Sequence, residues 1–304
     1  MIKTTIIGMG KIGYLYDRNK NYKKVTHFSS IKKSNNFKIV SVVEKNNKVL
    51  NIFKNQNKIP AYNNIFEAID NHQTELLVIA CELNFNTLRM VIDKTNIKYI
   101  LVEKPFIISK KNLQILRKLL IKNKISLTIN FQRNFSNNYI KFFSRIKNGL
   151  IGNQLKCYCY FNKSFEINAT HFLNLILLFN KKLVFIKKIN KDCIYIKFNK
   201  VDAYFFNVEK KYNNNSMIIF GSKGKIEISS RPEKAKLYLL QKDKTYKNIN
   251  ILNYKKIIKL YEKFPQLCVL KNIYETIKFK KNSLVSMKHI MEYLNIMQKI
   301  KKIS

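Results

Sequence analysis

The sequence predicts an α/β protein of two domains, in which a doubly wound parallel sheet precedes an α+β domain with a mixed, largely antiparallel open sheet. Two observations indicate this fold class. Strand-like and helix-like segments alternate up to residue 130, which is typical of βαβ units around a parallel sheet. Beyond residue 150, strand-like segments follow one another with short turns, which favours antiparallel pairing. We therefore expect one domain at residues 1–130 and a second at residues 131–304.

The first strand, residues 2–7, leads directly into the glycine motif GMGKIG. A G-x-G-x-x-G motif after a strand is typical of a Rossmann domain, where its glycines allow a tight turn, close approach to a pyrophosphate and close helix packing. The alternative is a plain glycine turn, but the chain holds only seven glycines, so three at this spacing favour the dinucleotide interpretation. The expected cofactor contacts in this loop are Gly8, Met9, Gly10, Lys11, Ile12 and Gly13.

The second strand, residues 37–43, ends at Glu44. An acidic residue there can accept both ribose hydroxyls of adenosine and would repel a 2′-phosphate, which favours NAD over NADP. Lys45 and Lys48 weaken this preference, so NADP stays open as an alternative. The distance from the glycine motif to Glu44 exceeds the usual ~20 residues, which indicates an insertion at residues 16–26. His27 follows it and is interpreted as a packing or capping residue outside the site.

The next segments continue the alternation. We expect helices at residues 65–71, 86–95 and 110–123, and strands at 75–80, 99–102 and 126–130. The strand that begins at Tyr99 stops at Glu103, Lys104 and Pro105, because proline ends a strand and keeps the preceding residue extended. Lys104 is thus presented at the carboxyl end of a strand, where open α/β sheets bind ligands. The alternative for Glu103 and Lys104 is a solvated exit from the strand.

The second half has a different pattern. Its expected helices are residues 142–147, the apolar segment 166–179 with His171, and two C-terminal helices at 261–279 and 283–300. Its expected strands are residues 154–161, 184–189, 193–198, 202–208, 216–220, 225–229 and 236–240.

Composition limits the classes of partner. With 304 residues and 46% hydrophobic content, the chain can bury a core in each domain. Its formal net charge of +40 would ordinarily suggest nucleic acid, but only six of the 58 basic residues are arginine, and the lysines are spread along the chain with a heavy use of Asn and Ile. Genome composition explains this bias as well as a ligand does, so we expect no specific nucleic-acid partner.

The five cysteines include no C-x-x-C pair, so neither a disulfide framework nor a metal site is expected. Cys157 and Cys159 share one face of a strand and are interpreted as packing residues. No apolar run has the length of a membrane span, and no secretory segment precedes the first strand. We therefore expect a cytoplasmic protein without a membrane partner.

Together, GMGKIG, VEKP and the strand-rich second half resemble the glucose-fructose oxidoreductase and inositol dehydrogenase (Gfo/Idh/MocA) family. Further similarity lies in NFQRNFSNNYIKFFSRIKNGLIGNQL, IFGSKGKIEI and LVSMKHIMEYLNIMQKI, so it spans nearly the whole chain. The segment NKSFEINATHFLNLILLF looks like a branch associated with bacterial sugar and surface-polysaccharide metabolism.

The resemblance implies an NAD(P)-dependent oxidoreductase that transfers hydride between nicotinamide and a carbinol or carbonyl carbon of a sugar, nucleotide sugar or polyol. It implies catalytic roles for Lys104 and His171, and it suggests substrate contacts at Asn168 and Arg133. Imidazole suits the transfer of a hydroxyl proton, and an ammonium group can stabilise alkoxide character. The implied cofactor contacts also include Cys81 and Glu103. Family members often pair through the exposed sheet of the second domain, so a homo-oligomer is expected.

Four positions depart from the family pattern, namely Glu82, Asn86, Asn134 and Asn174. Each removes a charge or a rigid turn from the expected cleft or, at Glu82, places a carboxylate near the nicotinamide. They leave an alternative open, a catalytically drifted nucleotide-binding scaffold or sensor of the same fold. Thr170 could bind substrate or act only as an N-cap.

Overall fold

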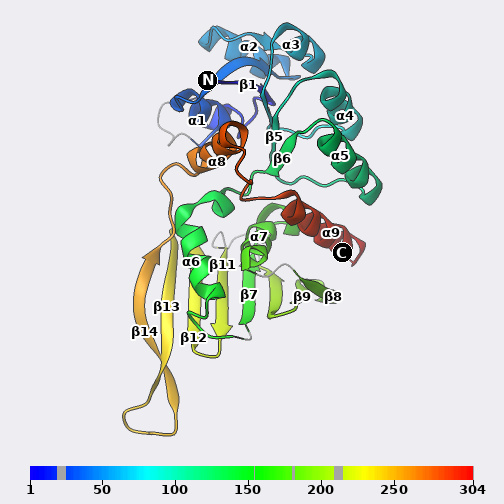
Figure 1. Ribbon diagram of the computed structural model, residues 1–304. Coiled ribbons are helices and arrows are strands. Elements are labelled where there is room, and N and C mark those ends of the chain that lie inside the picture. The colour runs from blue at the N-terminus through cyan, green and yellow to red at the C-terminus, as the bar shows by residue number, and fades with distance from the viewer. Residues whose placement is uncertain (19–24, 154, 180–181, 209–214, 304) are drawn as a thin grey trace. The chain divides into compact units, whose positions relative to one another are not determined.

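The computed structural model describes residues 1–18, 25–153, 155–179, 182–208 and 215–303, and the chain divides into two compact units (Figure 1). The first unit comprises Met1–Phe135 and Phe264–Met291, and the second comprises Ser136–Lys263 and Glu292–Ser304.

Residues 264–291 belong to the first unit, although the sequence analysis assigned them to the second domain. Their helix α8 (Pro265–Phe279) packs on α1 (His27–Lys33) and on the 3₁₀ turn η2 (Gln132–Phe135). The chain thus returns to its first unit late, through contacts that no local pattern encodes.

The first unit contains a six-stranded sheet in the order β3-β2-β1-β4-β5-β6. The strands are β1 (Ile2–Ile7), β2 (Phe37–Val43), β3 (Ala61–Tyr62), β4 (Leu76–Ile79), β5 (Tyr99–Val102) and β6 (Ser126–Ile129). Every neighbouring pair is parallel, and this is the doubly wound Rossmann order that binds dinucleotides where the strand order reverses, between β1 and β4. The predicted doubly wound parallel sheet is therefore confirmed.

Helices connect these strands, and polar side chains cap them. The remaining helices of this unit are α2 (Asn47–Gln56), α3 (Ile65–Asn71), α4 (Phe85–Lys94) and α5 (Lys110–Lys122). The side chains of Asn46, Asn64, Asn84 and Ser109 accept backbone N–H bonds at their N-termini. Because these caps satisfy donors that have no partner inside the helix, they fix where each helix begins.

The second unit contains an eight-stranded sheet in the order β14-β13-β12-β11-β7-β10-β9-β8. Its strands are β7 (Leu155–Phe161), β8 (Leu183–Asn190), β9 (Cys193–Phe198), β10 (Val201–Asn207), β11 (Ser216–Gly221), β12 (Gly224–Ser230), β13 (Glu233–Lys242) and β14 (Asn250–Lys259). β7 and β10 run parallel and the other neighbours antiparallel, which confirms the mixed, largely antiparallel sheet. Gln154, the expected start of one strand, lies outside the described residues.

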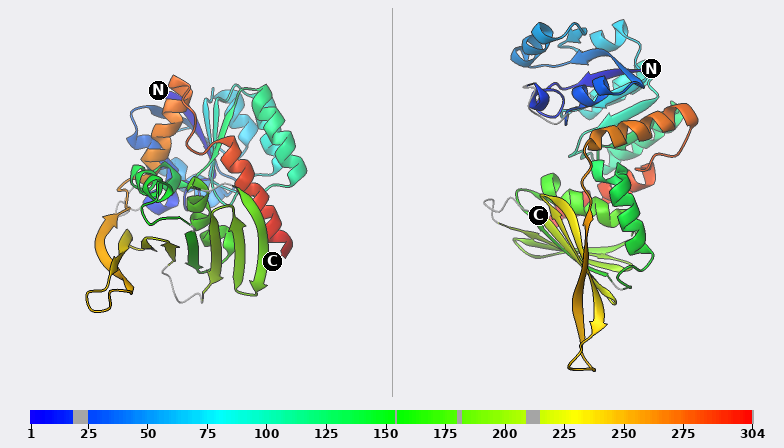
Figure 2. Two further views of the ribbon diagram at one scale, coloured as in Figure 1. Left: turned by 60° about the horizontal axis from the view of Figure 1, so that its bottom comes forward. Right: turned by 90° about the vertical axis from the view of Figure 1, so that its left-hand side faces the viewer.

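Within the described residues, helices cover one face of this sheet and leave the other face open. α6 (Asn137–Lys147) and α7 (Thr170–Phe179) pack together, and Figure 2 shows α6 on one face of the sheet. Cys157 and Cys159 point to the covered face with no exposed surface, and burial raises the pKa of both thiols far above its ordinary range. Their interpretation as packing residues is confirmed. The last helix, α9 (Met287–Ile303), begins in the first unit and ends in the second.

Candidate cofactor and catalytic site

The carboxyl ends of five neighbouring strands are aligned by backbone hydrogen bonds. Gly8 N–H donates to Val43 O, Ala80 N–H to Ile7 O, and Glu103 N–H to Ile79 O, each at 2.8 Å. Asn130 N–H donates to Val102 O at the same distance. The residues that follow β1, β2, β4, β5 and β6 therefore meet at one edge of the sheet, where open α/β sheets bind ligands.

The three glycines of the GMGKIG loop differ in the space around them. Gly8 adopts a φ of +90°, and a Cβ there would lie 2.7 Å from the Cβ of Cys81. A Cβ on Gly13 would lie 2.0 Å from Gly8 O, so this position admits no side chain. A Cβ on Gly10 would meet nothing within 4 Å. The loop thus packs tightly at its two ends and leaves space at its centre, which is the arrangement that a pyrophosphate requires.

The loop continues into one helical turn rather than a full helix. Tyr14 N–H donates to Gly10 O at 2.9 Å and Tyr16 N–H to Lys11 O at 3.0 Å. The next helix, α1, begins only at His27. Residues 19–24, which fall within the expected insertion at residues 16–26, lie outside the described part of the chain.

Asp17 is bonded to the residues at and just before the start of α1. Its carboxylate accepts hydrogen bonds from Val25 N at 3.2 Å, from Thr26 N and Oγ1 at 2.7 Å each, and from the hydroxyl of Ser29. Burial raises the pKa of Asp17, but these hydrogen bonds outweigh it and hold the pKa below its ordinary value. Thr26 in turn caps α1 by accepting from Ser29 N, so these contacts fix where α1 starts.

Glu44 lies against the glycine loop. Its Oε2 accepts from Met9 N–H at 2.7 Å and its Oε1 from Asn46 N–H at 2.8 Å. The carboxylate is therefore held beside the loop at the end of β2, where the ribose of a dinucleotide is expected.

A cavity of about 330 Å³ lies at the carboxyl ends of β4 and β5. It brings together Cys81, Glu82 and Glu103. Cys81 and Glu82 are exposed, so the carboxylate of Glu82 stays in contact with solvent rather than being buried near the cofactor. Desolvation at the sulfur and the neighbouring Glu44 carboxylate raise the pKa of Cys81 to about 11, so its thiol is neutral and suits a contact residue better than a nucleophile.

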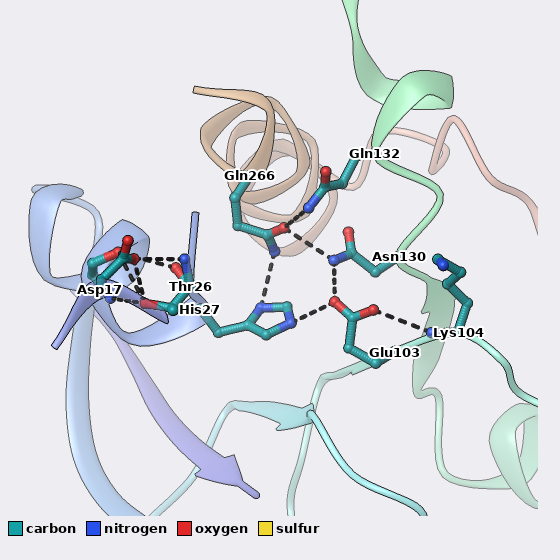
Figure 3. Close-up of polar contacts among 9 residues, drawn as sticks. Asp17, Thr26, His27, Glu103, Lys104, Asn130, Gln132 and Gln266 are labelled. Carbon is teal, nitrogen blue, oxygen red and sulfur yellow. Dashed lines mark hydrogen bonds and ion pairs between the residues drawn. The ribbon is translucent and has the colours of Figure 1, made fainter. Parts of the chain in front are cut away.

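Glu103 is the centre of a polar network in the first unit (Figure 3). Its Oε1 lies 2.7 Å from His27 Nε2 and also accepts from Asn130 Nδ2. Its Oε2 accepts from the backbone N–H of Lys104 at 3.2 Å. Gln266 of α8 completes the network, because its amide contacts both His27 and Asn130 at 3.0 Å.

The network keeps Glu103 ionised although its side chain is only 14% exposed. Burial raises the pKa of Glu103, but the hydrogen bonds from His27 and Asn130 and the positive charge of Lys104 together hold it below its ordinary value. Figure 3 shows Lys104 beside Glu103 and Asn130, on the side away from His27. A carboxylate and an ammonium group thus stand together at the end of β5, while Arg133 lies half-buried in the turn η2 after β6.

The second unit holds the other predicted site residues. His171 is half-buried in the first turn of α7, directly after a π-helical turn, η3 (Phe165–Ala169). Such turns occur frequently at functional sites. Asn168, within η3, donates through Nδ2 to Asn162 O at 2.8 Å and to Asn162 Oδ1 at 2.7 Å. The structure thus places Asn168 and His171 on one short segment.

Two neighbouring residues differ from the sequence-based interpretation. Thr170 is not an N-cap, because its hydroxyl donates to Glu166 O and the cap of this helical segment is Ser164. Asn174 is buried in α7 and donates to Thr170 O at 2.8 Å. The Asn174 amide is therefore bonded within the helix.

Sequence reasoning missed His27, Asn130 and Gln266. The sequence predicts a packing or capping role for His27, but its side chain is 1% exposed and bonded through both ring nitrogens. Asn130 could have been identified from its place at the end of a predicted strand, because buried amides at strand ends need hydrogen-bond partners. Gln266 carried no such signal, since it lies 239 residues from His27.

The strand order and the edge that carries the glycine loop define a dinucleotide-binding Rossmann protein. Residues 2–131 match the model of an oxidoreductase family with an NAD-binding Rossmann fold, Gfo/Idh/MocA. The first unit is therefore similar to this family over its Rossmann domain, and the expected cofactor class, NAD, is confirmed.

Solved structures share the fold over the whole chain. The WlbA dehydrogenase of Chromobacterium violaceum, solved with NADH and UDP-GlcNAcA, is 11% identical, with 99% of this chain and 93% of that chain covered at a TM-score of 0.74. The WlbA dehydrogenase of Bordetella pertussis, with the same ligands, is 12% identical, with 99% and 95% covered at 0.74. An oxidoreductase of Agrobacterium radiobacter, solved with NAD+, L-tartaric acid and magnesium, is 13% identical, with 99% and 96% covered at 0.72.

No curated protein sequence matches the chain. Among the described residues, no group of three or more His, Cys, Asp or Glu side chains could hold a metal ion. Within the same residues, no helix combines the length and apolar character needed to cross a membrane.

Proposed function

We propose that this protein is an NAD(P)-dependent dehydrogenase that oxidises a carbinol carbon, or reduces the matching carbonyl, of a sugar, nucleotide sugar or polyol. The observation that carries the proposal is the placement of Lys104 at the carboxyl end of β5, next to an ionised Glu103 and at the edge that holds the glycine loop. The sugar-type ligand of the two WlbA structures supports the substrate class.

The glycine loop and Glu44 would hold the cofactor. The open space at Gly10 admits a pyrophosphate, and the Glu44 carboxylate beside Met9 N–H can accept ribose hydroxyls. Bound NAD supplies a hydride acceptor at its nicotinamide ring. Cys81 and Glu103, which line the same cavity, would contact the cofactor on the side of β4 and β5.

The protein's own residues would handle the proton and the charge on oxygen. As the carbinol C–H bond and O–H bond break and a C=O bond forms, the His171 imidazole takes the hydroxyl proton. The Lys104 ammonium stabilises the negative charge that develops on that oxygen. Asn168 uses its Nδ2 to bind Asn162, so its carbonyl oxygen is the group it would offer to a sugar hydroxyl. Arg133 would contact the substrate from the end of β6.

The test is a turnover assay with NAD and NADP against a panel of sugars, sugar acids, polyols and UDP-sugars, together with a separate measurement of cofactor binding. Turnover of one substrate class supports the proposal. Cofactor binding without turnover of any substrate in the panel contradicts it and favours the drifted scaffold or sensor.

We further propose that copies of the chain associate through the open face of the eight-stranded sheet. This face carries a row of ring contacts, with Tyr204 stacked 4.7 Å from Tyr195 and 5.4 Å from Tyr158. Tyr160 and Phe206 stack beside them at 5.4 Å. Rings gathered on one partly exposed surface are typical of protein interfaces.

A further inference from the structure

His27 makes more contacts than a packing residue needs. It is the first residue of α1, it is 1% exposed, and its two ring nitrogens face Glu103 at 2.7 Å and Gln266 at 3.0 Å. A buried imidazole with a partner on each nitrogen has a fixed ring orientation, and its tautomer follows from what those partners can donate or accept.

Gln266 determines that tautomer. Its Oε1 accepts from Asn130 Nδ2 at 3.0 Å and from Gln132 Nε2 at 2.9 Å. The amide nitrogen of Gln266 must therefore face His27 and donate to Nδ1. With Nδ1 as acceptor, the ring proton lies on Nε2 and is donated to Glu103 Oε1. Gln266 thus sets the tautomer of His27 in which Nε2–H donates to Glu103.

The backbone at the same position holds the cofactor loop. His27 N–H donates to Ile12 O and Phe28 N–H donates to Gly13 O, each at 3.0 Å. The start of α1 is therefore bonded to the end of the glycine loop through its main chain, and to Glu103 through a side chain. Glu103 in turn accepts from the backbone N–H of Lys104. His27 is therefore bonded both to the glycine loop and to Glu103 at the end of β5.

We propose that His27 is a positioning residue, which sets Glu103 and, through it, the backbone of Lys104 relative to the glycine loop. It touches neither substrate nor cofactor in this role. The link between His27 and Glu103 stands on the geometry of the first unit, whereas its consequence for turnover rests on the proposed function.

The experiment compares His27→Ala with His27→Gln, because the Gln amide nitrogen can replace Nε2–H and donate to Glu103. The readout that does not depend on activity is the titration of Glu103, followed by carbon NMR of its carboxylate and assigned with Glu103→Gln. The titratable groups that face Glu103 are His27 of α1 and Lys104 at its own strand end. We expect the Glu103 midpoint to rise in His27→Ala and to return toward the wild-type midpoint in His27→Gln.

The second readout is kcat, measured with a substrate of the panel that the wild type turns over. Since a hydrogen bond to a charged group is lost, we expect kcat to fall about tenfold or more in His27→Ala, with partial recovery in His27→Gln. In a Glu103→Gln background, His27→Ala should cause little further loss of kcat, because the two residues act as a unit. Gln266→Leu, which removes the donor to Nδ1, should shift the Glu103 titration in the same direction as His27→Ala.

Several outcomes would overturn the proposal. One is a Glu103 midpoint that is equal in the wild type and in His27→Ala. Another is a normal kcat in His27→Ala despite a shifted midpoint. If His27→Ala does not fold, His27→Gln and Gln266→Leu carry the test alone, and unchanged Glu103 titration in Gln266→Leu contradicts the proposal. If no substrate turns over, the proposed function fails, while the titration still decides whether His27 controls Glu103.

Discussion

The backbone N–H of Met9 donates to the carboxylate of Glu44 at 2.7 Å, which ties the glycine loop to the end of the second strand. The charge of Glu44 is thereby held where the ribose of the cofactor is expected.

We predict that Glu44→Gln weakens NAD binding by roughly 10- to 100-fold, since hydrogen bonds to a charged acceptor contribute about 1.5–3 kcal/mol. NADP binding should strengthen relative to NAD binding, because the repulsion of a 2′-phosphate is lost. Titration calorimetry with both cofactors measures this, and Asp70→Asn, which removes an exposed carboxylate of α3, is the control. An unchanged ratio of the two affinities would contradict the role of Glu44.

The glycine loop allows stability and cofactor binding to be separated. Gly13→Ala places a Cβ 2.0 Å from Gly8 O, so we predict a loss of about 1–3 kcal/mol in unfolding free energy from overpacking. Gly10→Ala places its Cβ in open space, so the thermal midpoint should stay near that of the wild type while NAD binding weakens. Thermal unfolding with and without NAD distinguishes the two effects. Equal destabilisation by both substitutions would rule out the steric argument.

Lys104 and His171 should govern turnover rather than cofactor affinity. We predict that Lys104→Ala and His171→Ala each lower kcat by ~10²–10⁴-fold, the range for loss of a positioned proton-transfer or charge-stabilising group, with NAD affinity nearly unchanged. Steady-state kinetics and NAD titration measure the two quantities. Lys110→Ala, at an exposed position of α5, and His72→Ala, whose ring contacts Tyr62, are the matched controls. Wild-type kcat in either site variant would remove that residue from the catalytic assignment.

Lowering the pH should destabilise the folded protein, in part because the Asp17 carboxylate becomes protonated. The folded-state pKa of this carboxyl lies below its unfolded value, so its contribution to stability is complete above the unfolded pKa, about 4, and is lost as the pH falls through the folded pKa. We predict that Asp17→Asn lowers the thermal midpoint at neutral pH and shows a shallower decline below pH ~4 than the wild type. Asp93→Asn, which removes an exposed pair with Arg89, is the control with little effect. Parallel pH profiles of the wild type and Asp17→Asn would contradict this account.

The stacked rings on the open sheet predict an oligomer that one substitution can weaken. Tyr204→Lys places a charge between Tyr158 and Tyr195, so we expect a lower molar mass by light scattering at the same protein concentration. Phe279→Lys, which replaces a 62% exposed ring on the first unit, should leave the mass unchanged. A wild-type protein that is monomeric at every concentration would refute the proposed association.

The sequence predicted those parts of the fold that local periodicity controls. The strands β4 and β5 are buried on both faces and appear as continuous apolar runs, so their position between helices was evident. β14 was not predicted, because Tyr254, Ile257 and its lysines are all exposed and the strand shows no alternation of buried and exposed positions. Helix α1 begins only at His27, well after the glycine motif, so the usual spacing from that motif did not locate it.

The site could be predicted only in part, for a similar reason. Lys104 and the glycine loop lie on contiguous motifs, and the sheet edge brings them together as parallel strands require. His27 meets Glu103 across 76 residues and Gln266 across 239, and no spacing rule connects residues at such separations. The helix cap at Ser164 was also missed, because a π-helical turn moves the start of the helix away from the position that a regular period suggests.

The hydrogen bonds that Asp17 accepts from Thr26 attach the start of α1 to the turn that follows the glycine loop. Because the main chain of His27 is also bonded to Ile12, the N-terminus of α1 and the glycine loop should open together as one cooperative unit. Amide hydrogen exchange at both places should therefore slow together when NAD binds.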